Sequence, residues 1–114
     1  MINLLQTICQ SEGIRLDAIS GLGSINGMAL KDPESGIRAI AYNDTLDGWS
    51  RITTIAHEIG HHALGHLDNG LDMDGFLSGS DKDYREKAEL EARVFASVFT
   101  ALAMFTGYYQ KETA

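Results

Sequence analysis

His57-Glu58-Ile59-Gly60-His61 places two histidines four residues apart, with a glutamate directly after the first. On an α-helix, residues at positions i and i+4 lie on the same face, so both imidazoles could reach one ion. Glu58 then lies about 100° further round the helix, where its carboxylate can act on a metal-bound water without binding the metal. The motif therefore predicts a helix in this part of the chain and the chemistry of a zinc hydrolase.

The composition is that of an ordinary globular protein. Of 114 residues, 44% are hydrophobic and 22% are charged, so we expect residues 1–114 to form one minimal domain. The net charge of −7, without a cluster of lysine and arginine, argues against a nucleic-acid partner. We see neither a signal peptide nor an apolar stretch long enough to cross a bilayer, so we expect a soluble cytoplasmic protein without a membrane partner.

The first half of the chain predicts a helix followed by a small sheet. Residues 2–12 have the apolar spacing of an amphipathic helix, which would place the single cysteine, Cys9, in the core. Residues 14–19 are expected to be a short extended or irregular link. Residues 26–31 and 36–42 are expected to form an antiparallel hairpin, because the proline and glycine between them favour a turn.

The second half predicts two helices separated by a loop. The motif helix should run from Ser50 to about Leu67, and a long final helix from about Asp81 to Tyr108. Residues 68–80 are rich in glycine and aspartate and are expected to be a loop. The final helix is apolar round much of its circumference from Val94 onward, so we expect that part to be buried. The expected N-caps are Asp47 or Ser50 for the first helix and Ser80 or Asp81 for the second.

Two histidines do not complete a catalytic zinc site, which normally has three protein ligands and a water. The final helix offers Glu86, Glu89 and Glu91 as a third ligand. Helical projection places Glu89 on the side of several alanines, and small residues let another helix approach closely. These alanines are Ala92, Ala96 and Ala103. We therefore favour Glu89 as the third ligand, with Glu91 as the second choice.

Two segments of the chain resemble a known signature. His57-Glu58-Ile59-Gly60-His61 is followed by Glu89-Leu90-Glu91-Ala92-Arg93-Val94-Phe95-Ala96. The pair resembles the ImmA/IrrE family of zinc metallopeptidases, which has HE-x-GH followed by E-x-E-A-N-x-F-A. The resemblance implies an α+β, gluzincin-like core with an N-terminal helix, a short antiparallel sheet, the motif helix and a long C-terminal helix. It implies that His57, His61 and Glu89 bind Zn²⁺ and that Glu58 is the catalytic base.

The resemblance also implies a protein or peptide substrate, such as a helix-turn-helix repressor cleaved at one site. An extended substrate could pair with a strand edge near residues 38–42, and Tyr84 and His66 are open candidates for the oxyanion donor. Arg93 stands where the family usually has asparagine, and arginine cannot accept the N–H of a ligating histidine. The alternative is therefore a catalytically weak or inactive module of the same fold that binds a regulatory protein.

Three further features have more than one interpretation. His62 and His66 are also four residues apart, and we expect surface or capping roles for them rather than a second metal site. Gly60 either leaves room for a substrate or a strand, or is a tolerated substitution. An apolar side of the final helix could form a homodimer surface. Its residues are Val98, Leu102, Phe105 and Tyr109.

Overall fold

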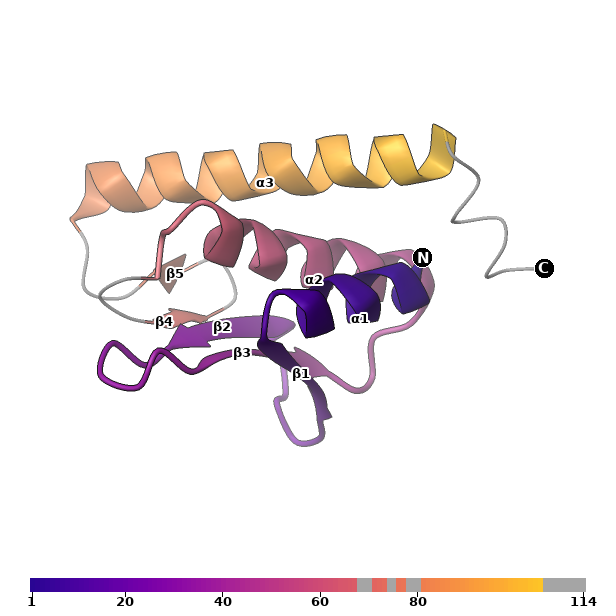
Figure 1. Cartoon of the computed structure of the whole chain (residues 1–114), viewed down its shortest axis with the longest axis horizontal. Coiled ribbons are helices and arrows are strands. Elements are labelled where there is room, and N and C mark those ends of the chain that lie inside the picture. The colour runs from indigo at the N-terminus through magenta and orange to yellow at the C-terminus, as the bar shows by residue number, and fades with distance from the viewer. Residues whose placement is uncertain (68–70, 74–75, 78–80, 106–114) are drawn as a thin grey trace.

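The computed structural model describes residues 1–67, 71–73, 76–77 and 81–105. Figure 1 shows a long helix, α3, above α2, with the sheet on the other side of α2. The arrangement confirms the predicted α+β fold. The helices are α1 (Ile2–Ser11), α2 (Gly48–Ala63) and α3 (Lys82–Phe105). The strands are β1 (Ile14–Ile19), β2 (Gly27–Lys31), β3 (Arg38–Asn43), β4 (Leu71–Met73) and β5 (Phe76–Leu77).

The centre of the sheet is the predicted hairpin of β2 and β3. The strands are antiparallel, with Ala29 opposite Ile40, and both of these residues are buried. The carboxylate of Asp32 closes the turn, because it accepts hydrogen bonds from the Ser35 hydroxyl at 2.7 Å and the Glu34 N–H at 3.1 Å. The hairpin therefore follows from local turn chemistry and from burial of one face of each strand.

The sheet is larger than predicted, and it is mixed. Its strand order is β1-β3-β2-β4-β5, with β1 parallel to β3 and the other pairs antiparallel. Residues 14–19, expected as a link, are β1, and the expected loop at 68–80 contains β4 and β5. The prediction of an exposed strand edge at residues 38–42 is wrong, because β3 lies between β1 and β2 and pairs with both.

The core lies between the sheet and α2. One side of α2 buries Ile52, Ile55 and Ile59, while α1 packs on β1 and beside α2 (Figure 1). Cys9 of α1 is 1% exposed, which confirms its predicted place in the core. Packing in this core therefore fixes the position of α2, and with it the motif, relative to the sheet.

The start of α2 is close to the prediction, and its end is earlier. Asp47 is the N-cap residue, although its side chain makes no capping hydrogen bond. The helix ends at Ala63 rather than near Leu67, because Gly65 adopts a left-handed conformation with φ +73°. The N–H of Gly65 donates to the carbonyl of His62 at 3.3 Å, and the N–H of His66 donates to that of His61 at 3.0 Å. These two bonds form a Schellman motif, which turns the chain back over the last turn of α2.

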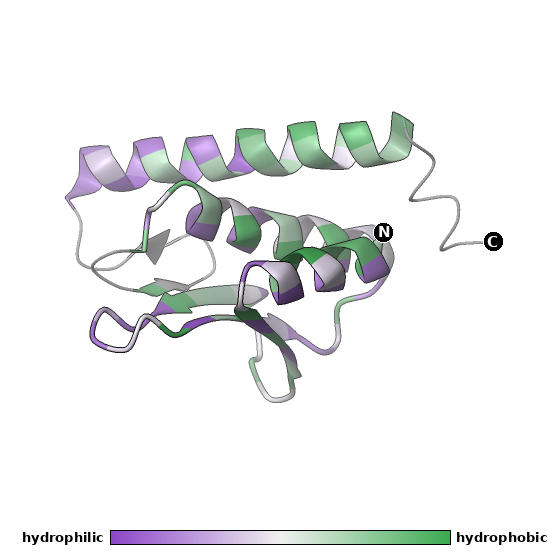
Figure 2. Cartoon of the chain, in the orientation of Figure 1, coloured by the Kyte–Doolittle hydropathy of each residue, from purple (hydrophilic) through white to green (hydrophobic). Residues whose placement is uncertain are grey.

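The long helix α3 begins as predicted, because the Asp81 carboxylate accepts a hydrogen bond from the Tyr84 N–H at 2.8 Å. Ser80 and the predicted end at Tyr108 lie outside the described residues. Figure 2 shows that the first half of α3 is hydrophilic and the second half hydrophobic. The predicted burial of this second half is wrong, since Val98 is 54% exposed and Leu102 is 61% exposed. The buried residues of α3 are small: Ala88, Ala92, Ala96, Thr100 and Ala103.

The apolar residues of α3 that face away from α2 are exposed. Phe105, at 93%, is the most exposed of them, and Tyr109 lies outside the described residues. A homodimer through this face stays a prediction. Among the described residues, no helix combines the length and the apolar character that crossing a bilayer requires.

Candidate metal centre

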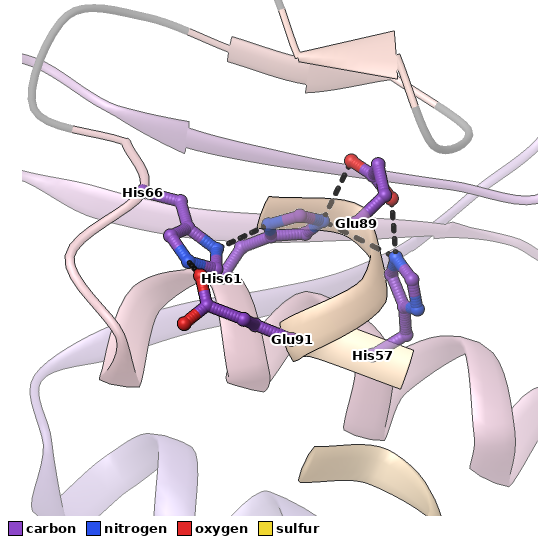
Figure 3. Close-up of polar contacts among 5 residues, drawn as sticks. All are labelled: His57, His61, His66, Glu89 and Glu91. Carbon is purple, nitrogen blue, oxygen red and sulfur yellow. Dashed lines mark hydrogen bonds and ion pairs between the residues drawn. The ribbon is translucent and has the colours of Figure 1, made fainter. Parts of the chain in front are cut away.

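The structure brings the side chains of His57, His61 and Glu89 together between α2 and α3 (Figure 3). Nε2 of His57 lies 2.9 Å from Oε2 of Glu89, and Nε2 of His61 lies 3.1 Å from Oε1 of the same carboxylate. The two Nε2 atoms are 3.2 Å apart. Three potential ligand atoms from two helices thus face one another across a small space.

These separations suit a single divalent cation. With metal–ligand bonds of about 2.0–2.2 Å, neighbouring ligands of a tetrahedral zinc ion lie about 3.3–3.6 Å apart. The observed contacts of 2.9, 3.1 and 3.2 Å are slightly shorter. Two imidazoles and one carboxylate are also a known ligand set of catalytic zinc, with a fourth position left for water. The residues present therefore fit a catalytic metal of this type.

Close packing of α2 on α3 brings Glu89 within reach of the histidines. Gly60 lies on the face of α2 that contacts α3, against Phe95 and the backbone of Ala92. The alanine stripe of α3 lies in this contact, as the helical projection predicted. Gly60 therefore makes room for a helix, and not for a substrate or a strand as the sequence suggested.

Glu58 lies beside this cluster on the floor of a groove. Its side chain is buried, at 2% exposure, and Gly27 of β2 passes so close that a Cβ there would lie 3.5 Å from Cγ of Glu58. Both His57 and Glu58 line the groove, which has a volume of about 680 Å³. The start of β2 and one face each of α2 and α3 form its walls. A buried carboxylate next to a possible metal ligand can serve as a proton acceptor for a molecule in this groove.

A second set of contacts lies behind His61, on the side away from His57 (Figure 3). The His61 side chain is fully buried, and its Nδ1 lies 3.0 Å from Nδ1 of His66. Nε2 of His66 lies 3.3 Å from Oε1 of Glu91. Burial lowers the pKa of His66, while the Glu91 carboxylate acts in the opposite direction. The predicted surface role of His66 is therefore wrong, and Glu91 contacts His66 and not the three converging ligand atoms.

The comparison with protein families agrees with this geometry. The model of the IrrE N-terminal-like domain of M78 peptidases matches residues 9–103, a range that includes both motif histidines, Glu58 and Glu89. The chain belongs to the M78 peptidase family. The match confirms the resemblance seen in the sequence. Together with the cluster of potential metal ligands, it indicates a metallopeptidase. A search of curated proteins found no match to the chain.

Arg93 departs from the asparagine that the signature of this family leads one to expect. Its side chain is exposed and lies on the wall of the groove with His57. It cannot accept a hydrogen bond from a ligating histidine, but Nδ1 of His66 lies where it can do so for His61. Although Arg93 replaces the asparagine of the M78 signature, His61 therefore still has a neighbour, His66, that can accept a hydrogen bond.

The two candidate oxyanion donors do not line the groove of this M78 domain. Both ring nitrogens of His66 face other side chains, and the Tyr84 ring packs edge-on against His66 with centroids 6.4 Å apart. Trp49 at the start of α2 instead lines the groove and is 44% exposed. Aromatic residues at exposed helix starts look alike in a sequence, whether they pack internally or line a groove.

His62 links α2 to the sheet. It is 8% exposed, and its Nε2 donates a hydrogen bond to the carbonyl of Ala39 at 3.0 Å. Burial lowers the pKa of His62, although the bond to Ala39 acts in the opposite direction. His62 is thus a core histidine, and the expected surface role is wrong for it as well.

Proposed function

We propose that this chain is a zinc-dependent peptidase that cleaves a regulatory protein at a defined site. His57, His61 and Glu89 hold the zinc ion, and Glu58 is the catalytic base. The convergence of the three ligand atoms beside the groove is the observation that carries this proposal. Bound zinc lowers the pKa of its water toward neutrality and polarises a substrate carbonyl.

Glu58 moves the proton. Its buried carboxylate adjoins His57 on the groove floor, so it can accept a proton from the attacking water and deliver it to the leaving amine. The low exposure of Glu58 keeps bulk solvent from competing for that proton. Gly27 contributes by its lack of a side chain, because the backbone of β2 can then pass close to Thr54 on the helix that carries Glu58.

The groove suits an extended peptide. Its wall includes Asn26 and Gly27 at the start of β2, whereas its described lining includes no residue of β3. We therefore place the substrate backbone along residues 26–27, and not along β3. Trp49, exposed in the same groove, offers an aromatic surface for an apolar substrate side chain.

The charge of the chain favours a basic substrate. A net charge of −7 attracts positively charged segments, and helix-turn-helix repressors carry such segments because they bind DNA. A repressor of this class, cleaved in the cytoplasm, is accordingly the substrate that we propose.

The test is to load the purified protein with zinc and to measure bound metal by mass spectrometry and cleavage of candidate repressors by electrophoresis. Glu58→Gln should keep the metal and lose cleavage, whereas Glu89→Gln should lose both. Absence of stoichiometric zinc from the folded wild type would contradict the proposal. A repressor bound intact by both the wild type and Glu58→Gln would favour the alternative of a docking module without catalysis.

A further inference from the structure

We infer that His66 and Glu91 form a positioning pair, which holds His61 in the one neutral tautomer that can bind a metal through Nε2. The inference rests on the proposed metal site, and it assigns a role to two residues outside the three ligands. Neither residue lines the groove, so neither is expected to touch the substrate.

The contacts run in one line from the carboxylate to the ligand (Figure 3). Oε1 of Glu91 lies 3.3 Å from Nε2 of His66, and Nδ1 of His66 lies 3.0 Å from Nδ1 of His61. Nε2 of His61, at the other end of its ring, faces Glu89 at 3.1 Å. Each ring nitrogen of the two imidazoles in the line thus faces another side chain.

The Glu91 carboxylate favours one arrangement of the hydrogens along this line. A carboxylate only accepts, so the favourable arrangement puts a hydrogen on Nε2 of His66 and leaves its Nδ1 as an acceptor. His61 must then carry its hydrogen on Nδ1 and donate it to His66. This leaves a lone pair on Nε2 of His61, which is the atom that faces Glu89 and His57.

The opposite arrangement would prevent metal binding through His61. If His66 donated from Nδ1, His61 would carry its hydrogen on Nε2 and could not coordinate an ion there. Nε2 of His66 would then direct a lone pair at the Glu91 carboxylate, which is repulsive. Without a cation, the Glu89 carboxylate faces the lone pair on Nε2 of His61 in the same way and opposes the productive tautomer. The negative charge of Glu91 favours that tautomer from the other end of the line, in the manner of carboxylates behind metal-binding histidines.

The backbone holds His66 in place for this role. The Schellman motif at the end of α2 has Gly65 at its left-handed position and joins the His66 N–H to the His61 carbonyl. The side chain of His66 is 4% exposed, whereas that of Glu91 is 46% exposed. A ring fixed at the helix end and shielded from water is thus oriented by a carboxylate that solvent can reach.

The first experiment measures zinc affinity by competition with a chelator. Glu91→Ala should weaken binding about 10-fold and His66→Phe about 10- to 100-fold, the range typical for such outer partners. His66→Gln should fall between the wild type and His66→Phe, because the amide offers both an acceptor and a donor. Two control variants should change affinity by less than about 2-fold on the same reasoning. They are Glu86→Ala, an exposed carboxylate on α3 near Glu89, and His62→Gln, the other buried histidine of this region.

The second experiment reads the tautomers by ring-nitrogen NMR in metal-free Glu89→Gln, where an amide that can donate to Nε2 of His61 replaces the opposing carboxylate. Glu89→Gln should carry hydrogens on Nδ1 of His61 and Nε2 of His66, and adding Glu91→Ala should shift both rings toward the opposite tautomers. Circular dichroism checks that each variant is folded, and because Glu91 is exposed its replacement by alanine removes little packing.

The outcomes separate this inference from the proposed function. Equal zinc affinity in the wild type, Glu91→Ala and His66→Phe would overturn the positioning pair, even if the wild type is an active enzyme. So would a hydrogen on Nε2 of His61 in metal-free Glu89→Gln. If the wild type binds no zinc, the proposed function fails, while the NMR result still decides whether Glu91 sets the tautomers.

Discussion

Gly60 of α2 faces Phe95 of α3 with no space for a side chain between them. A Cβ on Gly60 would lie 3.0 Å from Cδ1 of Phe95 and 3.3 Å from the carbonyl oxygen of Ala92. Phe95 is itself stacked on Phe99, with ring centroids 6.2 Å apart, which limits how far it can move. The spacing of the two helices at the metal centre therefore depends on the absence of a side chain at residue 60.

Gly60→Ala should destabilise the protein by about 1–2 kcal/mol, because overpacking here outweighs the gain in helix propensity. At an open helical site the same change would stabilise by about 1 kcal/mol, so the sign of the effect is informative. It should also weaken zinc binding, since pushing α3 outward moves Glu89 away from the histidines. Urea unfolding and zinc titration measure the two effects.

A double variant provides the control for this prediction. Phe95→Ala removes the ring atom nearest to the new methyl group, so Gly60→Ala should cost less in that background. If Gly60→Ala instead raises the free energy of unfolding in the wild-type background, the helices are not as tightly constrained at this point as the distances indicate.

A second close approach, between Gly27 and Thr54, gives a test of the groove. A Cβ on Gly27 would lie 2.6 Å from Cγ2 of Thr54, a distance that forces one of the two elements to move. Gly27→Ala should therefore destabilise by about 1–3 kcal/mol, the usual cost of overpacking. Cleavage should fall as well, because β2 borders the groove and passes close to Glu58.

Thr54→Ser is the matched variant, because it removes Cγ2 and keeps the hydroxyl. In its presence the cost of Gly27→Ala should drop by at least about half, a coupling that a double-mutant cycle in urea detects. Simple additivity of the two substitutions would show that the contact with Thr54 is not what excludes a side chain at Gly27.

The three candidate metal ligands could be found in the sequence because the signal is local and periodic. The spacing of His57 and His61 sets a helix face, and the alanine stripe beside Glu89 gave the side of α3 that meets it. Whether Val98 and Leu102 are buried or exposed could not be judged in this way. A hydrophobic run does not reveal how many of its sides are covered, and in this structure the described contacts of α3 are with α2 and β5.

Other parts of the structure depend on contacts far apart in the sequence. β1 pairs with β3 in parallel, from Ile14 opposite Arg38, and no local turn marks such a partner. The contact of His61 with His66 did have a local signal, since Gly65 is a typical residue for ending a helix. The contact of His66 with Glu91 had none, because it joins two elements across the intervening strands.

Asn43 should prove to be a strong stability determinant at the end of β3. Its amide donates to the carbonyls of Gly23 and Ile25, both at 3.0 Å, and its side-chain oxygen accepts from the N–H and hydroxyl of Thr45. The residue is 4% exposed. Asn43→Ala should cost about 2–4 kcal/mol, because it leaves several polar groups without these bonds.

Asn43→Asp distinguishes this explanation from simple loss of volume. Aspartate has nearly the same shape, but its carboxylate cannot donate to the two carbonyls and would lie against their negative ends. We expect it to destabilise at least as much as Asn43→Ala at neutral pH in urea unfolding. Thr45→Val should cost only about 1 kcal/mol, because the Thr45 N–H bond remains. Near-wild-type stability of Asn43→Asp would count against this account.

Cys9 should make stability fall with rising pH in the alkaline range. Burial at 1% exposure raises the pKa of the thiol above its ordinary value of 9.0. Above pH 9.0 the unfolded chain releases the thiol proton while the folded chain keeps it, so the unfolded state binds fewer protons. The contribution is therefore fully present below pH 9.0 and is lost as the pH rises toward the raised pKa of the folded state.

The measurement is urea unfolding of the wild type and Cys9→Ala on both sides of pH 9.0. Below it, Cys9→Ala should be less stable by about 1 kcal/mol through lost packing, and the difference should shrink at higher pH. The thiol should also react slowly with an aromatic disulfide reagent until denaturant is added, because the reactive thiolate is suppressed in the fold. A difference between the two proteins that stays constant across pH 9.0, or rapid labelling of the native state, would show that the thiol is more accessible than its position in the core implies.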